Sequence, residues 1–206
     1  MKKVSLLLMA FFLFATNGSI AQGKYYIIFC AENGFPGHAF LSFGKEDNIK
    51  QASTIESWGF APANNFARIE LIASVIVSGT ILGNVSLPGA ITNNSKIKAD
   101  YTLSKEVDFN TYNKAIAVKN KWSNNEYKLT ESDCVSFLIE VADEVAKTVS
   151  GFIVPPRSGL ENWPAKYLQK LIELNKRNKL TGKWMCYEIS GYMNVPDDIV
   201  PNLVEI

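Results

Sequence analysis

The chain has 206 residues, 47% of them hydrophobic and 12% aromatic, which is enough apolar material for one domain with a full core. Its 21 lysines and arginines nearly balance 20 acids, so the charge gives no electrostatic case for binding nucleic acid. The sequence contains no internal repeat, low-complexity tract or Gly/Ser-rich linker. We therefore expect a single domain.

The first 21 residues have the pattern of a secretory signal peptide. Lys2 and Lys3 form a charged start, residues 4–15 are apolar, and residues 19–21 make a small-x-small cleavage site. The apolar run is shorter than the ~20 residues that cross a bilayer, so we expect removal of this segment and no stable membrane span. The mature domain then spans residues 22–206 and is secreted or periplasmic. It keeps 19 basic residues against 20 acids.

The first half of the mature chain has the alternation and the branched or aromatic residues that are typical of strands. The predicted strands are residues 24–31, 38–44, 49–57 and 101–107. A turn cluster at 32–37 separates the first two. The stretch 67–89 is ambiguous, and its content of Val, Ile, Gly and Pro favours strands over a long helix.

The second half contains two well-marked helix starts. Asp108 is a predicted N-cap, and the helix after it is expected to end at 123–125. Thr130 and Asp133 form a capping-box-like start, in which Asp takes the place of the usual Glu or Gln. An apolar stripe at helical spacing begins there with Cys134, and the helix is expected to stop before residue 151.

A third helix is expected to begin near residues 162–164, after Pro155 and Pro156 force an extended approach. A last strand is expected around residues 184–189. Strands followed by helices and a final strand predict an α+β fold.

His38 is the only histidine in the chain, so imidazole-assisted thiol chemistry has one possible base. The alternation of its strand puts His38, Phe40 and Ser42 on one face. Cys134 is expected about one turn into its helix, where backbone N–H groups and the helix dipole lower a thiol pKa and could bind an oxyanion. A strand-borne His38 facing Cys134 across a cleft would supply a nucleophile and its base. The structural alternative is that Cys134 is a small core residue and that His38 is structural or exposed.

Three cysteines in an exported chain raise the question of pairing. An odd count leaves at least one thiol without an intramolecular partner. A disulfide between Cys30 and Cys186 is one alternative, provided that their Cα atoms come within about 7 Å. Cys134 is then the cysteine with a different role.

Four short motifs occur in a fixed order along the chain. They are Gly37-His38-Ala39-Phe40, Ser57-Trp58-Gly59-Phe60-x-Pro62, Tyr127-x-Leu129 and Asp133-Cys134-Val135-x-Phe137. This set resembles the circularly permuted branch of the NlpC-like papain-fold hydrolases, in which lecithin retinol acyltransferase is a relative. The last motif is similar to the Asn-Cys-x-x-Phe motif of that branch, where the His strand precedes the Cys helix as it does here.

The resemblance covers most of the mature chain. It implies a permuted papain-like fold, with an antiparallel sheet packed against the helix that bears Cys134. It also implies Cys134 as the nucleophile and His38 as the general base. The third catalytic residue, which orients the imidazole, is not clearly matched.

A hairpin argument supplies candidates for that third residue. If the chain closes a hairpin at 44–48, the residues opposite His38 lie near 54–56. Glu56 is then the first candidate and Ser57 the second, since a carboxylate would hold the correct tautomer of the imidazole. The alternative for Glu56 is a solvated surface acid.

Trp58, Phe60 and Trp163 are candidates for lining a substrate groove, and core packing is the alternative for at least two of them. We expect no metal, because one histidine and separated cysteines lack ligand spacing. We expect no phosphate-binding cofactor either, because the glycines around 79–89 lack the Lys and Ser/Thr of a phosphate loop.

Together these features predict an exported thiol hydrolase, an amidase or peptidase that forms a thioester on Cys134 and resolves it with water. The resemblance and the compartment imply a cell-wall peptide, such as the peptidoglycan stem, or a related amide as substrate. A lipid acyl hydrolase or acyltransferase with the same dyad is one alternative, and it would need an apolar groove beside Cys134. A non-catalytic binding module of the same fold is the other.

Overall fold

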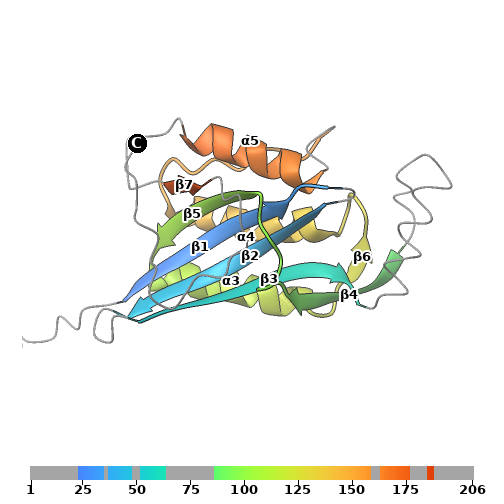
Figure 1. Cartoon of the computed structure of the whole chain (residues 1–206), viewed down its shortest axis with the longest axis horizontal. Coiled ribbons are helices and arrows are strands. Elements are labelled where there is room, and N and C mark those ends of the chain that lie inside the picture. Colours follow the sequence, from blue (N-terminus) through green and yellow to red (C-terminus); the bar gives the residue numbers. More distant parts are fainter. Residues whose placement is uncertain are drawn as a thin grey trace, which may run out of the picture.

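The computed structural model describes residues 23–34, 37–47, 52–63, 86–158, 163–176 and 185–187 (Figure 1). The expected signal peptide, residues 1–21, lies outside these residues. Most of the ambiguous stretch, residues 67–85, also lies outside them. Within the described part of the chain, no helix has the length and apolar character needed to cross a membrane.

The described residues form seven strands and three helices, which confirms the α+β class. The strands are β1 (Lys24–Glu32), β2 (His38–Asp47), β3 (Ala52–Pro62), β4 (Ser86–Asn93), β5 (Tyr101–Val107), β6 (Glu126–Lys128) and β7 (Met185–Tyr187). The helices are α3 (Phe109–Trp122), α4 (Cys134–Thr148) and α5 (Pro164–Lys176). The short strand β6, between α3 and α4, was not predicted from the sequence.

The strands make one sheet in the order β6-β4-β3-β2-β1-β5-β7, and every neighbouring pair is antiparallel. In the centre, β2 lies between β1 and β3. The register pairs Glu32 with His38 at one end of β1 and β2. It pairs Phe43 with Glu56 in the hairpin of β2 and β3.

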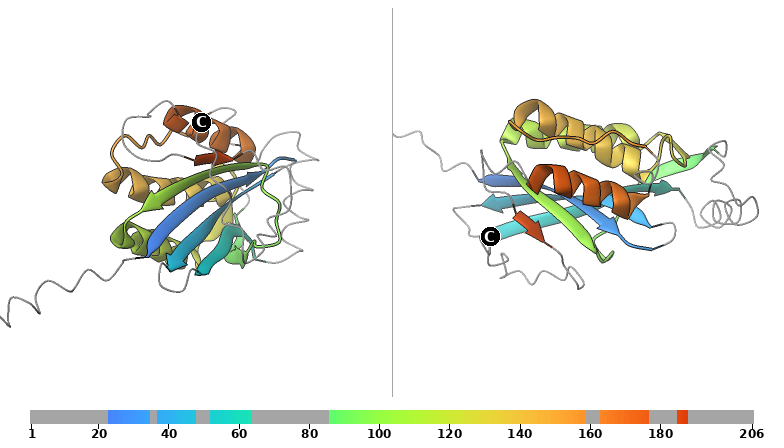
Figure 2. Two further views of the ribbon diagram at one scale, coloured as in Figure 1. Left: turned by 60° about the vertical axis from the view of Figure 1, so that its left-hand side comes forward. Right: turned by 90° about the horizontal axis from the view of Figure 1, so that it is seen from above.

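All three helices pack into the core on one face of this sheet. Figures 1 and 2 show α3 and α4 along the sheet and α5 beside β1 and β5. The strand residues in this core include Ile27, Phe29, Ala39, Leu41 and Phe43. Alternation along the strands sends Cys30 and Phe40 to the opposite face, where they cluster with Ala99.

Two helix starts agree with the sequence pattern. The Asp108 carboxylate accepts a hydrogen bond from the Thr111 N–H at 2.7 Å and caps α3. Helix α5 begins at Pro164, whose fixed φ and missing N–H suit the first helical position. Both predictions are confirmed.

The start of α4 differs from the expected capping box. Asp133 is itself the N-cap, and its carboxylate accepts from the N–H groups of Val135 and Ser136. Thr130 has a φ of 68° and donates its N–H to the same carboxylate at 2.8 Å. Because the cap lies three residues later than predicted, Cys134 is the first residue of the helix and not one turn inside it.

Candidate functional site

Cys134 lies in the core at the first position of α4, with 4% of its surface exposed. Two hydrogen-bond donors reach its sulfur. One is the backbone N–H of Ala39, on β2, and the other is the hydroxyl of Tyr127, on β6. Both donors favour the thiolate over the thiol. The sulfur is therefore held between two strands that are far apart in the sequence.

Burial nevertheless dominates the acidity of this thiol. It raises the pKa of Cys134 to about 12, and the neighbouring Asp133 carboxylate adds to the rise. Hydrogen bonds from Ala39 and Tyr127 and the charge of Arg157 act in the opposite direction. The expectation of a lowered pKa is wrong for this conformation, because desolvation of the thiolate outweighs the favourable dipoles. The thiol is protonated at neutral pH.

The backbone N–H groups at the start of α4 are already engaged. Those of Val135 and Ser136 donate to Asp133, at 3.0 and 3.1 Å. They are not available to an oxyanion while this cap is intact. The donors at the sulfur are instead those of Ala39 and Tyr127.

His38 is the first residue of β2 and is 7% exposed. The residue before it, Gly37, has a φ of 75°, a left-handed conformation that a side chain would strain. The imidazole lies on the same face as Phe40, with ring centroids 6.1 Å apart. This agrees with the face predicted for it from strand alternation.

Asn94 is the hydrogen-bond partner of the imidazole. Its side-chain nitrogen lies 2.6 Å from Nε2 of His38, and its side-chain oxygen accepts from the Thr92 hydroxyl at 3.0 Å. The Asn94 backbone N–H donates to the carbonyl of Ser57 at 2.8 Å, which fixes this residue against β3. Asn94 is 2% exposed.

This contact can serve two states of the ring. With the amide nitrogen toward it, Nε2 accepts, and a neutral imidazole carries its proton on Nδ1. With the amide turned over, the oxygen of Asn94 accepts from an Nε2–H, and the Thr92 hydroxyl accepts from the amide nitrogen. The second arrangement leaves Nδ1 as the basic nitrogen.

The side chains of His38 and Asn94 meet next to the Cα of Gly59. A Cβ placed on Gly59 would lie 2.5 Å from Nε2 of His38 and closer still to the amide nitrogen of Asn94. No real Cβ tolerates such contacts, so the imidazole and the amide can approach here only over a residue without a side chain.

The thiol approaches β2 from the helix-covered face, whereas the imidazole lies on the face that bears Phe40. The sulfur of Cys134 accepts from Ala39, the residue that follows His38. The pairing of β2 with β3 ends at Leu41 and Trp58, although both strands continue beyond it. The thiol therefore reaches the main chain of β2 just beyond the last pair of this ladder, from the face that α4 covers.

Glu56 is not brought to His38. It pairs with Phe43, five residues further along β2, or roughly 16 Å at 3.3 Å per residue. Its carboxylate is exposed and accepts from the indole N–H of Trp58 at 3.3 Å. The hairpin continues as far as the Asp47–Ala52 pair and is longer than assumed, which displaces the register. The predicted orienting role of Glu56 is wrong, and Asn94 occupies that position.

Ser57, the second candidate, takes part only through its main chain. Its hydroxyl bonds to that of Ser42 at 2.7 Å, and Ser42 in turn contacts Cys30. Its carbonyl holds the backbone of Asn94. The residue therefore supports the partner of His38 through its carbonyl.

Of the three aromatic residues expected to line a groove, one is in the core and two are half-buried. Phe60 is fully buried against Trp122 and Tyr127, with centroids 4.8 and 5.5 Å apart, so it is a core residue and does not line an open groove. Trp58 is half-buried, and Lys119 of α3 lies over its ring at 4.6 Å. Trp163 is half-buried at the residue before α5.

Cys30 is a free, buried thiol, so the alternative of a Cys30–Cys186 disulfide is not realised. Strand β5 separates the two residues, because Cys30 pairs with Thr102 and Cys186 with Leu103. Two strand spacings amount to roughly 10 Å, beyond the reach of a disulfide.

Sequence reasoning missed one residue at the imidazole, Asn94, and two near the thiol, Tyr127 and Arg157. Asn94 follows a strand in a run of polar residues, a pattern common to many turns. Tyr127 was part of a motif but had no role. Arg157 follows two prolines, and nothing in its spacing connects it to Asp133.

In the described residues, no group of three or more His, Cys, Asp or Glu side chains could hold a metal ion. Comparison with protein-family models, with curated proteins and with solved structures found no match to this chain.

Proposed function

We propose that this protein is a thiol hydrolase in which Cys134 attacks an amide carbonyl, His38 is the base, and Asn94 orients His38. One observation carries the proposal. The Cys134 sulfur accepts a hydrogen bond from the residue after His38, while the His38 ring is held by a buried amide. Constellations of Cys, His and Asn occur in papain-like proteases, where the third residue fixes the ring.

The proposed reaction starts from a neutral thiol. The sulfur attacks the carbonyl carbon as Nδ1 of His38 takes the thiol proton, with the Nε2–H donating to the oxygen of Asn94. The imidazolium returns the proton to the leaving amine, and an acyl thioester remains on Cys134. Water, deprotonated by the same imidazole, then releases the acid and restores the thiol.

Two donors fit the charge that develops in this reaction. The N–H of Ala39 and the hydroxyl of Tyr127 both lie at the sulfur, beside which the carbonyl oxygen becomes negative. A raised thiol pKa is compatible with this route, because the proton leaves during the attack and no thiolate is needed beforehand.

The permuted papain-like arrangement remains part of the proposal. The order of His strand before Cys helix supports it, as does an antiparallel sheet packed against α4. The resemblance implies cell-wall peptide amides as substrates, and an exported chain would meet them. A binding module without catalysis is the second candidate, and the burial and high pKa of Cys134 favour it.

The test uses the mature chain, residues 22–206, and a mixture of muropeptides released from peptidoglycan. Mass spectrometry is expected to detect a new amine and a new carboxylate from one cleaved amide. The Cys134→Ala and His38→Ala variants are expected to give neither. Glu56→Gln is the matched control, because its carboxylate lies far from His38, and it is expected to match wild type. Binding of muropeptides without cleavage would support the second candidate.

A further inference from the structure

The segment after α4 returns to the start of the helix, and we name residues 150–158 the return segment. Helix α4 has 15 residues and is about 22 Å long, a distance that roughly seven extended residues can cover. Asn175 of α5 bonds to both the N–H and the carbonyl of Ile153, and Tyr167 donates to the carbonyl of Pro155. These contacts bring Arg157 to the N-terminal end of α4.

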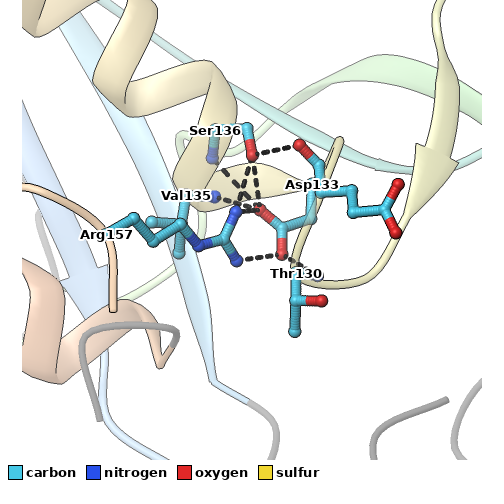
Figure 3. Close-up of polar contacts among 6 residues, drawn as sticks. Thr130, Asp133, Val135, Ser136 and Arg157 are labelled. Atoms are coloured by element: carbon cyan, nitrogen blue, oxygen red, sulfur yellow. Dashed lines mark hydrogen bonds and ion pairs between the residues drawn. The ribbon is translucent and has the colours of Figure 1, made fainter. Parts of the chain in front are cut away.

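There Arg157 meets Asp133 in a two-point ion pair (Figure 3). Its Nη1 and Nη2 donate to the two carboxylate oxygens, at 2.9 and 2.6 Å. Nη1 also lies 2.6 Å from the Ser136 hydroxyl. The side chains are 11% and 2% exposed, so solvent screens the pair little.

The carboxylate of Asp133 carries two tasks at once. It caps α4 through the N–H groups of Val135 and Ser136, and it also accepts from Thr130. Its charge lies one residue from the thiol, where it opposes a thiolate. The guanidinium of Arg157 offsets part of this charge, so the penalty that the Asp133 cap places on a thiolate is smaller than it would be without Arg157.

We propose that Arg157 is a positioning residue of the Cys134 site, which fixes the N-cap carboxylate of Asp133 and partly offsets its charge beside the sulfur. Its use in catalysis rests on the proposed function, whereas its effect on the thiol does not. Arg157 lowers the pKa of Cys134 and Asp133 raises it, in agreement with this geometry.

The experiment compares two variants with opposite expected signs. In R157M the uncompensated carboxylate is expected to slow alkylation of Cys134 by iodoacetamide about tenfold, at one mildly alkaline pH. In D133N the unpaired guanidinium is expected to speed it about tenfold. Peptide mass spectrometry distinguishes alkylation of Cys134 from alkylation of the other cysteines. Ultraviolet absorbance of the thiolate, relative to each variant combined with C134S, reports ionisation independently of access.

Two further variants keep the test decisive. K147M removes a cation from an exposed ion pair at the other end of α4 and is expected to alkylate like wild type. The double variant D133N/R157M has no net change of charge and is expected to lie between the single variants. If R157M does not fold, D133N carries the test.

The inference is overturned if both single variants change the thiol in the same direction, or if D133N leaves it unchanged or slows it. An ion pair with only a structural role predicts such results, because losing either Asp133 or Arg157 would destabilise the start of α4 in the same way. Opposite shifts in a protein that cleaves no amide would uphold the inference and refute the proposed function. If the protein cleaves the amide but neither substitution changes the reactivity of the thiol, the proposed function stands and the inference is refuted.

Discussion

At the scale of single residues, the site depends on how closely His38 and Asn94 can approach. Their 2.6 Å contact is buried, and it crosses Gly59, where no side chain intervenes. The imidazole is thus hydrogen-bonded to Asn94 in a space that a Cβ on Gly59 would occupy. Because Asn94 is itself fixed to β3 through Ser57, it would need little reorganisation in the proposed proton transfer.

Replacing Gly59 with Ala is expected to separate His38 from Asn94. A methyl group 2.5 Å from Nε2 must displace the ring, and a shift of about 1 Å in a catalytic group can cost on the order of a hundredfold in turnover. Amide cleavage by Gly59→Ala, measured per folded molecule, is expected to fall by about that factor. Gly44→Ala is the matched control, because its Cβ would meet Tyr26 at 3.3 Å and no site residue. Equal losses in both variants would show that strand packing is responsible.

Asn94→Asp and Asn94→Leu separate orientation from packing. A carboxylate accepts from Nε2–H in every state, so Asp is expected to keep turnover within about tenfold and to shift the pH profile of kcat by raising the pKa of His38. Leu has a similar size but no acceptor, and it is expected to lose a hundredfold or more. Wild-type turnover in Asn94→Leu would show that Asn94 does not orient His38.

At the scale of elements, local signals predicted most of the secondary structure. Alternation identified β1, β2 and β5, and Asp108 and Pro164 marked two helix starts, because capping and φ restrictions act within a few residues. The start of α4 was misplaced because Thr130 and Asp133 both suit a cap. The φ of 68° at Thr130 excludes it from that role, and the sequence does not reveal this conformation.

Asn175 is expected to be the main attachment of the return segment. It is fully buried and bonds to both main-chain groups of Ile153, so Asn175→Leu would leave two polar groups without these partners. The expected loss in the free energy of unfolding is roughly 2 to 5 kcal/mol, measured by urea denaturation. Tyr167→Phe removes one bond, to Pro155, and is expected to lose only about 1 to 2 kcal/mol. A larger loss in Tyr167→Phe would contradict this ranking.

At the scale of the whole molecule, the candidate site lies just beyond the pair at which the ladder of β2 and β3 ends. Sequence reasoning could propose Cys134 and His38 because residue type and order are local facts. It missed Asn94 and placed Glu56 wrongly, because the partner of His38 depends on hairpin length and on a strand that is distant in sequence. Such long-range register is not encoded in any one segment.

The two buried thiols are expected to make stability depend on alkaline pH. Burial raises the pKa of Cys30 and of Cys134 from 9.0 to about 12. A raised pKa contributes stability that is complete below about pH 9 and is lost as the pH rises toward about 12. The free energy of unfolding should therefore fall across this window, by up to ~1.4 kcal/mol per pH unit for each thiol. Cys134→Ser should fall less steeply than wild type, and equal slopes would contradict the assignment.

The central claim is that Cys134 is a nucleophile activated by His38, and the most direct measurement is the site of acylation by an activated ester. The protein of residues 22–206 is treated with p-nitrophenyl acetate, quenched in acid, and mapped by peptide mass spectrometry. We predict an acetyl group on Cys134, formed at least a hundredfold more slowly in His38→Ala. Acetylation of lysines alone, or equal acetylation of Cys134 in wild type and His38→Ala, would contradict the claim.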